Sequence, residues 1–336
     1  FPGALDAYQY DTDPTQATTP NDYEVSTLQL LQPTADLVLN NEWTLKLQSM
    51  LERSESHGSI IEEDYNKNHE ILTIRPIISH KINVMNRITT LDLGTEVQKG
   101  TFNFDAKTYN TKAEQKTYSL YFKYNIPITD KMAFNTGSRF SSSEQSSKGS
   151  EPLAYKANAV SAGISYALSP NIFLYTKAST NYRLPKTDEN NDTYDNKPLK
   201  LQTGNDFHIG MNYSIMGNQI SVDAYQLDLK NEIDSFIIPN SQDQFPVNIN
   251  LPNTERTGLS LLYTTKSFEN FTVNTSYHYT NAIYSSGPDS GKRMPMVSSN
   301  AIMLNPSYQI NQHWLFGLEG NYLSERNIAA IAHSTN

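Results

Sequence analysis

The chain repeats one local pattern along most of its length, and that pattern limits it to a small set of folds. Runs of about ten residues alternate apolar and polar side chains, and short polar turns join them in pairs. In one run, Phe207, Ile209 and Met211 fall on one face of an extended strand and His208 falls on the other. Residues 214–218 then supply a turn before the next run. The pattern predicts repeated antiparallel β-hairpins with one apolar face and one polar face.

The connections between the predicted strands alternate in length. Turns of about four to six residues are followed by loops of about a dozen to two dozen residues, of which the longest are 54–69, 183–205 and 235–254. This alternation is typical of a membrane barrel with small turns at one end and large loops at the other. We expect about fourteen strands, at residues 28–39, 43–53, 71–78, 88–98, 117–125, 132–140, 157–167, 172–182, 207–213, 219–225, 258–265, 271–279, 301–308 and 314–322.

Composition narrows the class of protein further. The 336 residues include 21 tyrosines, 13 phenylalanines and no cysteine, and the formal net charge is -9. The lack of cysteine excludes disulfide scaffolds and thiolate sites, and the acidic charge disfavours a nucleic-acid partner. Tyrosine rings have one apolar and one polar end, so their abundance suits a membrane interface. Apolar runs stay below the ~18 residues of a helical span, whereas a barrel strand needs only ~10.

Two kinds of soluble architecture compete with a membrane barrel. A β-sandwich also alternates wet and dry faces, and solenoids and propellers also consist of short strands. The chain has no repeat of fixed length, which disfavours solenoids and propellers. Asn, Ser, Thr, Lys and Gln dominate the second face of most strands, and this favours a wide polar lumen over the packed core of a sandwich.

Several segments resemble the C-terminal half of TonB-dependent receptors. Residues 174–185 are similar to the family strand that ends in an aromatic residue, an arginine and a proline, and 199–210 are similar to its signature strand, with an acidic residue shortly before a glycine. The order of the similar segments agrees with the family over about residues 174–323. The other similar segments are the proline- and glycine-rich opening at 1–7 and 13–17, the strand 223–233 with its lysine-asparagine pair, and the asparagine, arginine and glycine segment 253–261.

This resemblance implies an all-β, antiparallel transmembrane barrel. Residues 1–336 would be a partial barrel domain, with about 14 of about 22 strands, lacking the family's plug domain and terminal strands. The resemblance further implies a monomeric receptor in the outer membrane of a Gram-negative bacterium, which imports a scarce nutrient, above all a ferric siderophore. Its partners would be that chelate, outer-membrane lipid and the TonB complex, which acts through the plug. Receptors for cobalamin or haem, and a plug-free porin-like or fatty-acid channel, remain alternatives.

Motifs for catalysis or metal binding are absent from the sequence. It has no GxSxG elbow, no HExxH helix and no phosphate-binding glycine loop, so a cell-surface lipase or protease barrel lacks its catalytic residues. The acidic run 188–195 has no glycine at the sixth place of an EF-hand loop. We therefore expect no enzyme activity, no cofactor and no bound metal.

Candidate ligand-binding residues follow from the resemblance. The family holds its ligand with aromatic and cationic residues of long loops and the upper lumen, because ferric siderophores are often anionic and have flat groups. Each candidate has an ordinary alternative, as an interface ring or a solvated charge. The candidates are Tyr182, Arg183 and Tyr194 in one region, Tyr284, Lys292 and Arg293 in a second, and Tyr8 and Tyr10 near the start.

Overall fold

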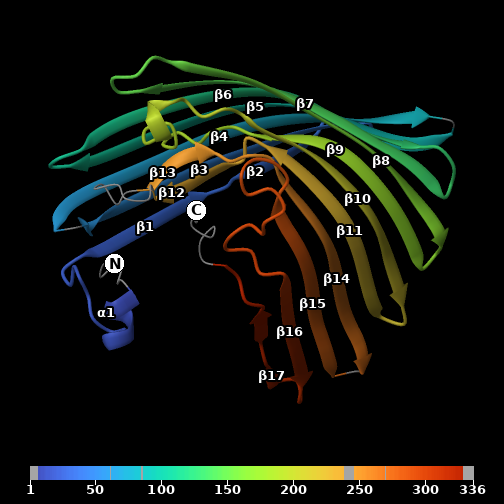
Figure 1. Cartoon of the computed structure of the whole chain (residues 1–336). Helices are drawn as coiled ribbons and strands as arrows, with labels where there is room; N and C mark the ends of the chain where they lie inside the picture. Colours follow the sequence, from blue (N-terminus) through green and yellow to red (C-terminus); the bar gives the residue numbers. More distant parts are fainter. Residues whose placement is uncertain (1–6, 61, 85, 238–245, 269, 328–336) are drawn as a thin grey trace.

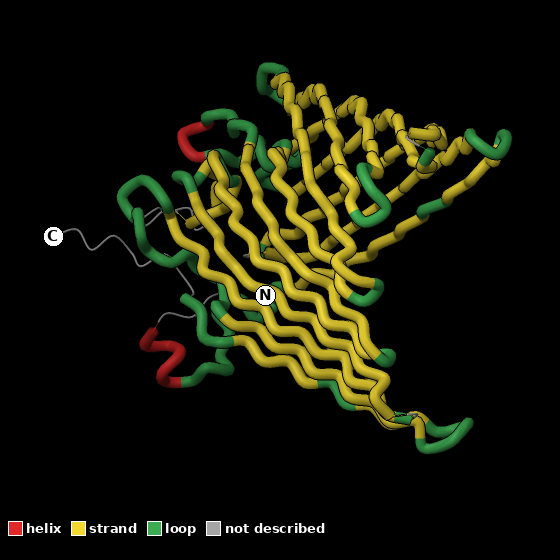
Figure 2. Tube along the Cα trace, turned by 90° about the vertical axis from the view of Figure 1, so that its right-hand side faces the viewer, coloured by secondary structure: helices red, strands yellow, loops and turns green. Residues whose placement is uncertain are grey.

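The structure is dominated by one large, curved antiparallel sheet, beside which stands a separate two-stranded sheet (Figures 1 and 2). The computed structural model describes residues 7–60, 62–84, 86–237, 246–268 and 270–327. The hydrogen-bonded path of its 16-stranded main sheet runs through fourteen strands, because β2 and β18 lie off the path beside β3 and β16. The prediction of a partial all-β barrel with about fourteen strands is confirmed. The strands are β1 (Tyr23–Leu31), β2 (Thr34–Val38), β3 (Trp43–Ile60), β4 (Glu63–Val84), β5 (Arg87–Ala106), β6 (Asn110–Pro127), β7 (Met132–Ser147), β8 (Leu153–Ser169), β9 (Ile172–Arg183), β10 (Gln202–Ile215), β11 (Asn218–Lys230), β12 (Ile233–Ile237), β13 (Pro246–Asn250), β14 (Thr254–Phe268), β15 (Phe271–Tyr284), β16 (Asn300–Gln309), β17 (Leu315–Gly317) and β18 (Gly320–Leu323).

Helical structure is scarce in the described part of the chain. It consists there of α1 (Ala7–Thr12) and the short 3₁₀ helix η1 (Tyr194–Asn196). Neither is long and apolar enough to cross a bilayer. Residues 1–6 of the proline- and glycine-rich opening that resembles the family lie outside the described residues.

Each long strand has one apolar and one polar face. Val97, Leu120 and Phe140 of β5, β6 and β7 are exposed on one side, whereas Glu96 and Ser141 are buried on the other. Side chains of neighbouring strands converge on the concave side of a curved sheet, so the crowded polar side is the concave one. We call it the inner face, and we call the apolar side the outer face. Because large apolar side chains are exposed and no second sheet covers them within the described residues, the sandwich alternative is wrong.

Several strands are longer than their apolar segments. The predicted loop 54–69 is wrong, because β3 and β4 continue through it, with Ser54 opposite His69 and Ile60 opposite Glu63. The two strands contain 18 and 22 residues. Both faces are polar in this part, so hydrophobic alternation could not reveal strands that extend beyond the apolar band.

Prolines divide two of the predicted strands. Predicted strand 28–39 forms β1 and β2, on either side of Pro33. Predicted strand 314–322 forms β17 and β18, which pair with β16 on either side of its residue Pro306. Proline has no N–H to donate to a ladder, so the pairing is interrupted there. The predicted loop 235–254 also needs correction, since part of it belongs to the separate β12–β13 hairpin.

Local backbone chemistry explains the tight turns and the close packing of rings on the inner face. Met216 and Gly217 have φ angles of 49° and 82°, as a two-residue hairpin turn with the strand twist of a sheet requires. The Tyr121 ring lies over Gly94 on the neighbouring strand, and a Cβ at Gly94 would overlap that ring. Glycine is therefore required at Gly94 by the close approach of an aromatic side chain.

Candidate functional site

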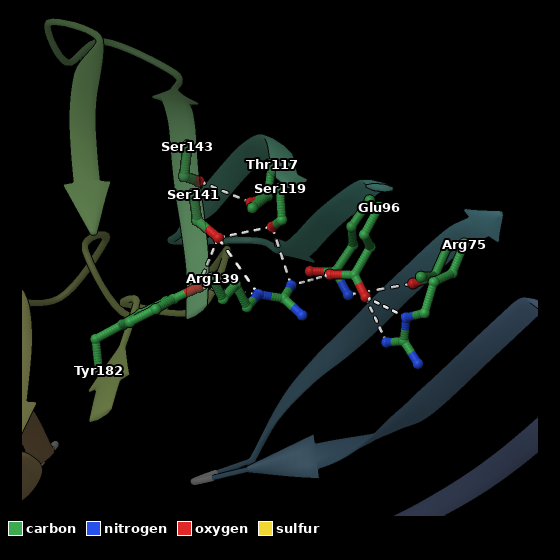
Figure 3. A network of polar contacts seen from close by, with 10 residues as sticks. Arg75, Glu96, Thr117, Ser119, Arg139, Ser141, Ser143 and Tyr182 are labelled. Carbon is green, nitrogen blue, oxygen red and sulfur yellow. Dashed lines mark hydrogen bonds and ion pairs between the residues drawn. The ribbon is translucent and has the colours of Figure 1, made fainter. Parts of the chain in front are cut away.

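A row of polar side chains crosses the inner face of β5, β6 and β7. Glu96 on β5 is paired with Ser119 on β6, which is paired with Ser141 on β7. Residues directly opposite each other in an antiparallel ladder point to the same face. Arg139 occupies the next inner position of β7, so four polar side chains meet at one height of the wall (Figure 3).

The Glu96 carboxylate lies between two guanidinium groups. Arg75 of β4 donates from Nε to Oε2 of Glu96 at 2.7 Å, and its Nη2 donates to the same oxygen. Arg139 donates from Nη2 to Oε1. The Glu96 side chain is 6 % exposed, whereas those of Arg75 and Arg139 are 39 % and 33 % exposed. One buried carboxylate thus faces two cations, which leaves one positive charge uncompensated.

The hydroxyl group of Tyr182 joins this network from β9. Arg139 donates from Nε to it at 3.0 Å, and it lies 2.5 Å from Oγ of Ser141. Ser179 is the last residue of β9 in register with β8, so Tyr182 reaches β7 beyond the end of that pairing. We call Arg75, Glu96, Ser119, Arg139, Ser141 and Tyr182 the wall cluster. Its guanidinium and hydroxyl groups are suited to binding an anion.

Residues 184–201 connect β9 to β10 and fold back onto the inner face. We call them the inward segment. Gln145 donates from Nε2 to the Thr187 carbonyl at 2.7 Å, and Gln115 donates from Nε2 to the Pro185 carbonyl at 2.9 Å. Gln145 and Pro185 are both fully buried. Gln115 and Gln145 are cross-strand partners. They lie closer than the wall cluster to the end of the wall where β9 connects to β10. The inward segment therefore covers the wall on that side of the cluster.

Two further side chains hold the inward segment in shape. Asn190 donates to Oε1 of Gln145 at 2.7 Å and to the Tyr155 hydroxyl at 3.1 Å. Arg183 forms an ion pair with Glu189, whose side chain is 14 % exposed. The guanidinium group of Arg183 is therefore engaged inside the segment.

Two neighbouring connections contact the inward segment. Tyr109, between β5 and β6, donates its hydroxyl hydrogen to Oδ1 of Asp192 at 3.2 Å. Asn248 of β13 donates from its backbone N–H to the Asp192 carbonyl at 2.8 Å and from its side chain to the Glu189 carbonyl at 2.9 Å. Burial raises the pKa of Asp192, and the charge of Asp188 adds to this rise, although the hydrogen bond from Tyr109 opposes it. The three connections thus form one polar cap.

The first group of predicted ligand residues lies in the inward segment or directly before it. Tyr182 belongs to the wall cluster, Arg183 is paired within the inward segment, and Tyr194 lies in η1 with 45 % of its surface exposed. Their role in ligand binding stays a prediction.

The second and third groups lie elsewhere. The Tyr284 ring is buried in a small apolar cluster, Lys292 forms an ion pair with Asp289 at 3.0 Å, and Arg293 is exposed. Tyr8 and Tyr10 are exposed on α1, which lies apart from η1 in both views (Figures 1 and 2).

Sequence reasoning missed most of the wall cluster and both anchoring glutamines. Glu96 and Arg139 stand in predicted strands 88–98 and 132–140, on the polar face. A buried charge requires an opposite charge nearby, so these two side chains were a usable signal. Among the described residues, no group of three or more His, Cys, Asp or Glu could hold a metal ion.

Several solved structures share this fold. They include the ferric citrate transporter FecA in its unliganded form, with a TM-score of 0.78 and 16% identity over 97% of this chain and 53% of that one. The ferric-catecholate import receptor Fiu from K12 E. coli has a TM-score of 0.74 and 13% identity over 96% of this chain and 58% of its own. The ferric yersiniabactin uptake receptor FyuA from Yersinia pestis has a TM-score of 0.69 and 12% identity over 90% and 50%.

This chain spans about half the length of these structures. The search of curated protein sequences found no match. The family model "TonB dependent receptor-like, beta-barrel" matches residues 2–334. The chain therefore belongs to the TonB-dependent receptor β-barrel family.

Proposed function

We propose that the protein forms part of the barrel wall of an outer-membrane receptor that takes up a ferric siderophore in a TonB-dependent way. The family match and the fold shared with iron-uptake receptors support this proposal. The proposed receptor lies in the outer membrane of a Gram-negative bacterium, acts as a monomer, and contacts the TonB complex through a plug domain. The wall itself contributes binding surface and makes or breaks no bonds.

The wall cluster is the observation on which this proposal chiefly rests. Its excess positive charge lies on the polar inner face beside the inward segment, and its member Tyr182 accepts a hydrogen bond from Arg139 (Figure 3). Guanidinium groups bind carboxylates and other planar anions well, and aromatic rings stack on flat ligand groups. An anionic iron chelate matches this chemistry.

Deletion of the intact gene tests the transport function. The deletion strain should lose growth on one ferric siderophore as sole iron source, and uptake of the ⁵⁵Fe-labelled chelate should stop both in this strain and in a strain without TonB. Normal uptake in the deletion strain would remove the proposal. Uptake that persists without TonB would instead support a plug-free channel, and loss of growth on haem or cobalamin alone would change the ligand.

Substitutions in the receptor test the candidate binding residues. Arg183→Ala and Arg293→Ala should each weaken binding of the ferric siderophore, and Arg53→Ala should not, because Arg53 pairs with Glu70 on the outer face. Unchanged affinity in both variants would remove these two residues from the site. Loss of binding in Arg53→Ala would show that the assay reports general damage to the barrel.

A further inference from the structure

The outer face has a groove on the side of the sheet opposite the wall cluster. Tyr118, Leu120 and Phe140 line it, and each exposes more than half of its surface. The groove has a volume of about 630 Å³ and includes Lys156 of β8. Lys156 is paired with Ser142. Ser142 lies one outer position closer than Phe140 to the end of the wall where β9 connects to β10. Large apolar side chains therefore dominate the groove, beside polar Thr95 and Asn158, and an ammonium group lies at one end.

Two more lysines stand beside that end. Lys99 and Lys116 are cross-strand partners. They lie one outer position closer than Val97 and Tyr118 to the end of the wall where β9 connects to β10. Glu114 lies 3.4 Å from Lys99 and 2.8 Å from Lys116. A single carboxylate thus forms ion pairs with both ammonium groups.

Lys156 adds a positive charge that no ion pair neutralises. Its ammonium group has no carboxylate within 4.0 Å among the described residues. Glu144 is a second acidic side chain beside these lysines, because it is paired with Lys116; we call Lys99, Lys116, Lys156, Glu114 and Glu144 the border. With three lysines and two glutamates, the border keeps an excess of positive charge.

The height of these side chains decides what they meet in a membrane. The apolar band of a barrel contacts acyl chains, and the first polar residues above it lie among the lipid headgroups. Lysine side chains extend toward that interface, and anionic headgroups attract them. A lipid whose phosphate groups give it net negative charge therefore complements both the apolar groove and the charge at its end.

We propose that this groove binds an anionic membrane lipid whose negative charge comes from phosphate groups. An acyl chain lies along Tyr118, Leu120 and Phe140, and a headgroup phosphate contacts Lys156, with Lys99 and Lys116 beside it. The inference requires only that the outer face meets lipid, and it goes beyond the proposed iron uptake. Net negative charge on the headgroup is the feature that the three ammonium groups select, because the phosphate of a zwitterionic headgroup is already balanced by its own cationic group.

Native mass spectrometry of the receptor in mild detergent tests the proposal, with lipid A as the anionic probe and phosphatidylcholine, whose phosphate is balanced by choline, as the zwitterionic one. The receptor should retain lipid A and release phosphatidylcholine. Each lysine near an anionic surface changes affinity by roughly fivefold, so Lys156→Gln should weaken lipid A binding about fivefold and the triple variant with Lys99→Gln and Lys116→Gln on the order of 100-fold. Ser142→Trp should weaken it by filling the groove while all charges remain.

Lys230→Gln is the matched control, because Lys230 ends β11 on the outer face at the same end of the wall, beside Asp228. Equal binding of lipid A by the triple variant and the unaltered receptor would overturn the proposal, and so would an equal loss in Lys230→Gln. Loss of dimers rather than of lipid would assign the groove to a second copy and also overturn it. Heat-dependent gel migration checks folding, and iron uptake is measured separately, so failure of this site and failure of the transport proposal are distinguishable.

Discussion

Replacing Glu96 with glutamine should destabilise the barrel substantially. The substitution keeps the shape of the side chain but leaves the guanidinium groups of Arg75 and Arg139 without their shared carboxylate. A hydrogen bond to a charged group contributes about 1.5–3 kcal/mol, and breaking a fully buried ion pair costs about 3–5 kcal/mol. Both arginines are about one third exposed and can regain water, so we expect a loss of about 2–3 kcal/mol in the free energy of unfolding.

Urea unfolding of the receptor in detergent micelles, followed by tryptophan fluorescence, measures this loss. Glu70→Gln is the matched control, since Glu70 contacts Arg53 at 2.6 Å on the outer face and both side chains are about half exposed. An exposed pair of this kind contributes at most about 1 kcal/mol. Equal destabilisation by Glu96→Gln and Glu70→Gln would refute the claim that burial and the double pairing make Glu96 important. A double-mutant cycle with Arg139→Gln should show a coupling of about 1–3 kcal/mol.

Three further substitutions probe the fold and the cap. Gly94→Ala should destabilise the barrel by about 1–3 kcal/mol in the same urea assay, because the added Cβ overlaps the Tyr121 ring. Adding Tyr121→Ala should remove most of this destabilisation by Gly94→Ala, and an unchanged destabilisation would refute the explanation. Gln145→Ala removes three hydrogen bonds to the inward segment, which together contribute about 2–4 kcal/mol to its docking. Trypsin should therefore cut after Lys186 on the order of 30-fold faster or more. An unchanged rate of cutting would show that other contacts hold the segment. The raised pKa of Asp192 means that its ionised form disfavours the docked segment: docking should be strongest below the ordinary pKa of 3.8 and should weaken as the pH rises through the raised pKa. Hydrogen exchange of the segment against pH measures this, and Asp192→Asn should flatten the profile.

The wall of the barrel could be predicted from the sequence because its two faces obey a period of two. Phe207, Ile209 and His208 take the sides that simple alternation assigns to them. The ends of the strands could not be predicted in the same way. From Ser54 to His69 both faces meet water or polar side chains, so extended strand and loop have the same composition there, and only the pairing of β3 with β4 distinguishes them.

The wall cluster shows why the site was harder to predict than the wall that carries it. Alternation places Glu96 and Arg139 on the inner face, but their contact depends on the register of β5 with β6 and of β6 with β7, and a shift of one residue in either pairing would turn one of them to the outer face. Tyr182 depends in addition on where β9 leaves β8. Registers are set by turns and by packing over the whole sheet, whereas alternation is read within one strand. Residues whose role needs only a loop position, such as Tyr194, could therefore be proposed from sequence, while those that act across several strands required the three-dimensional structure.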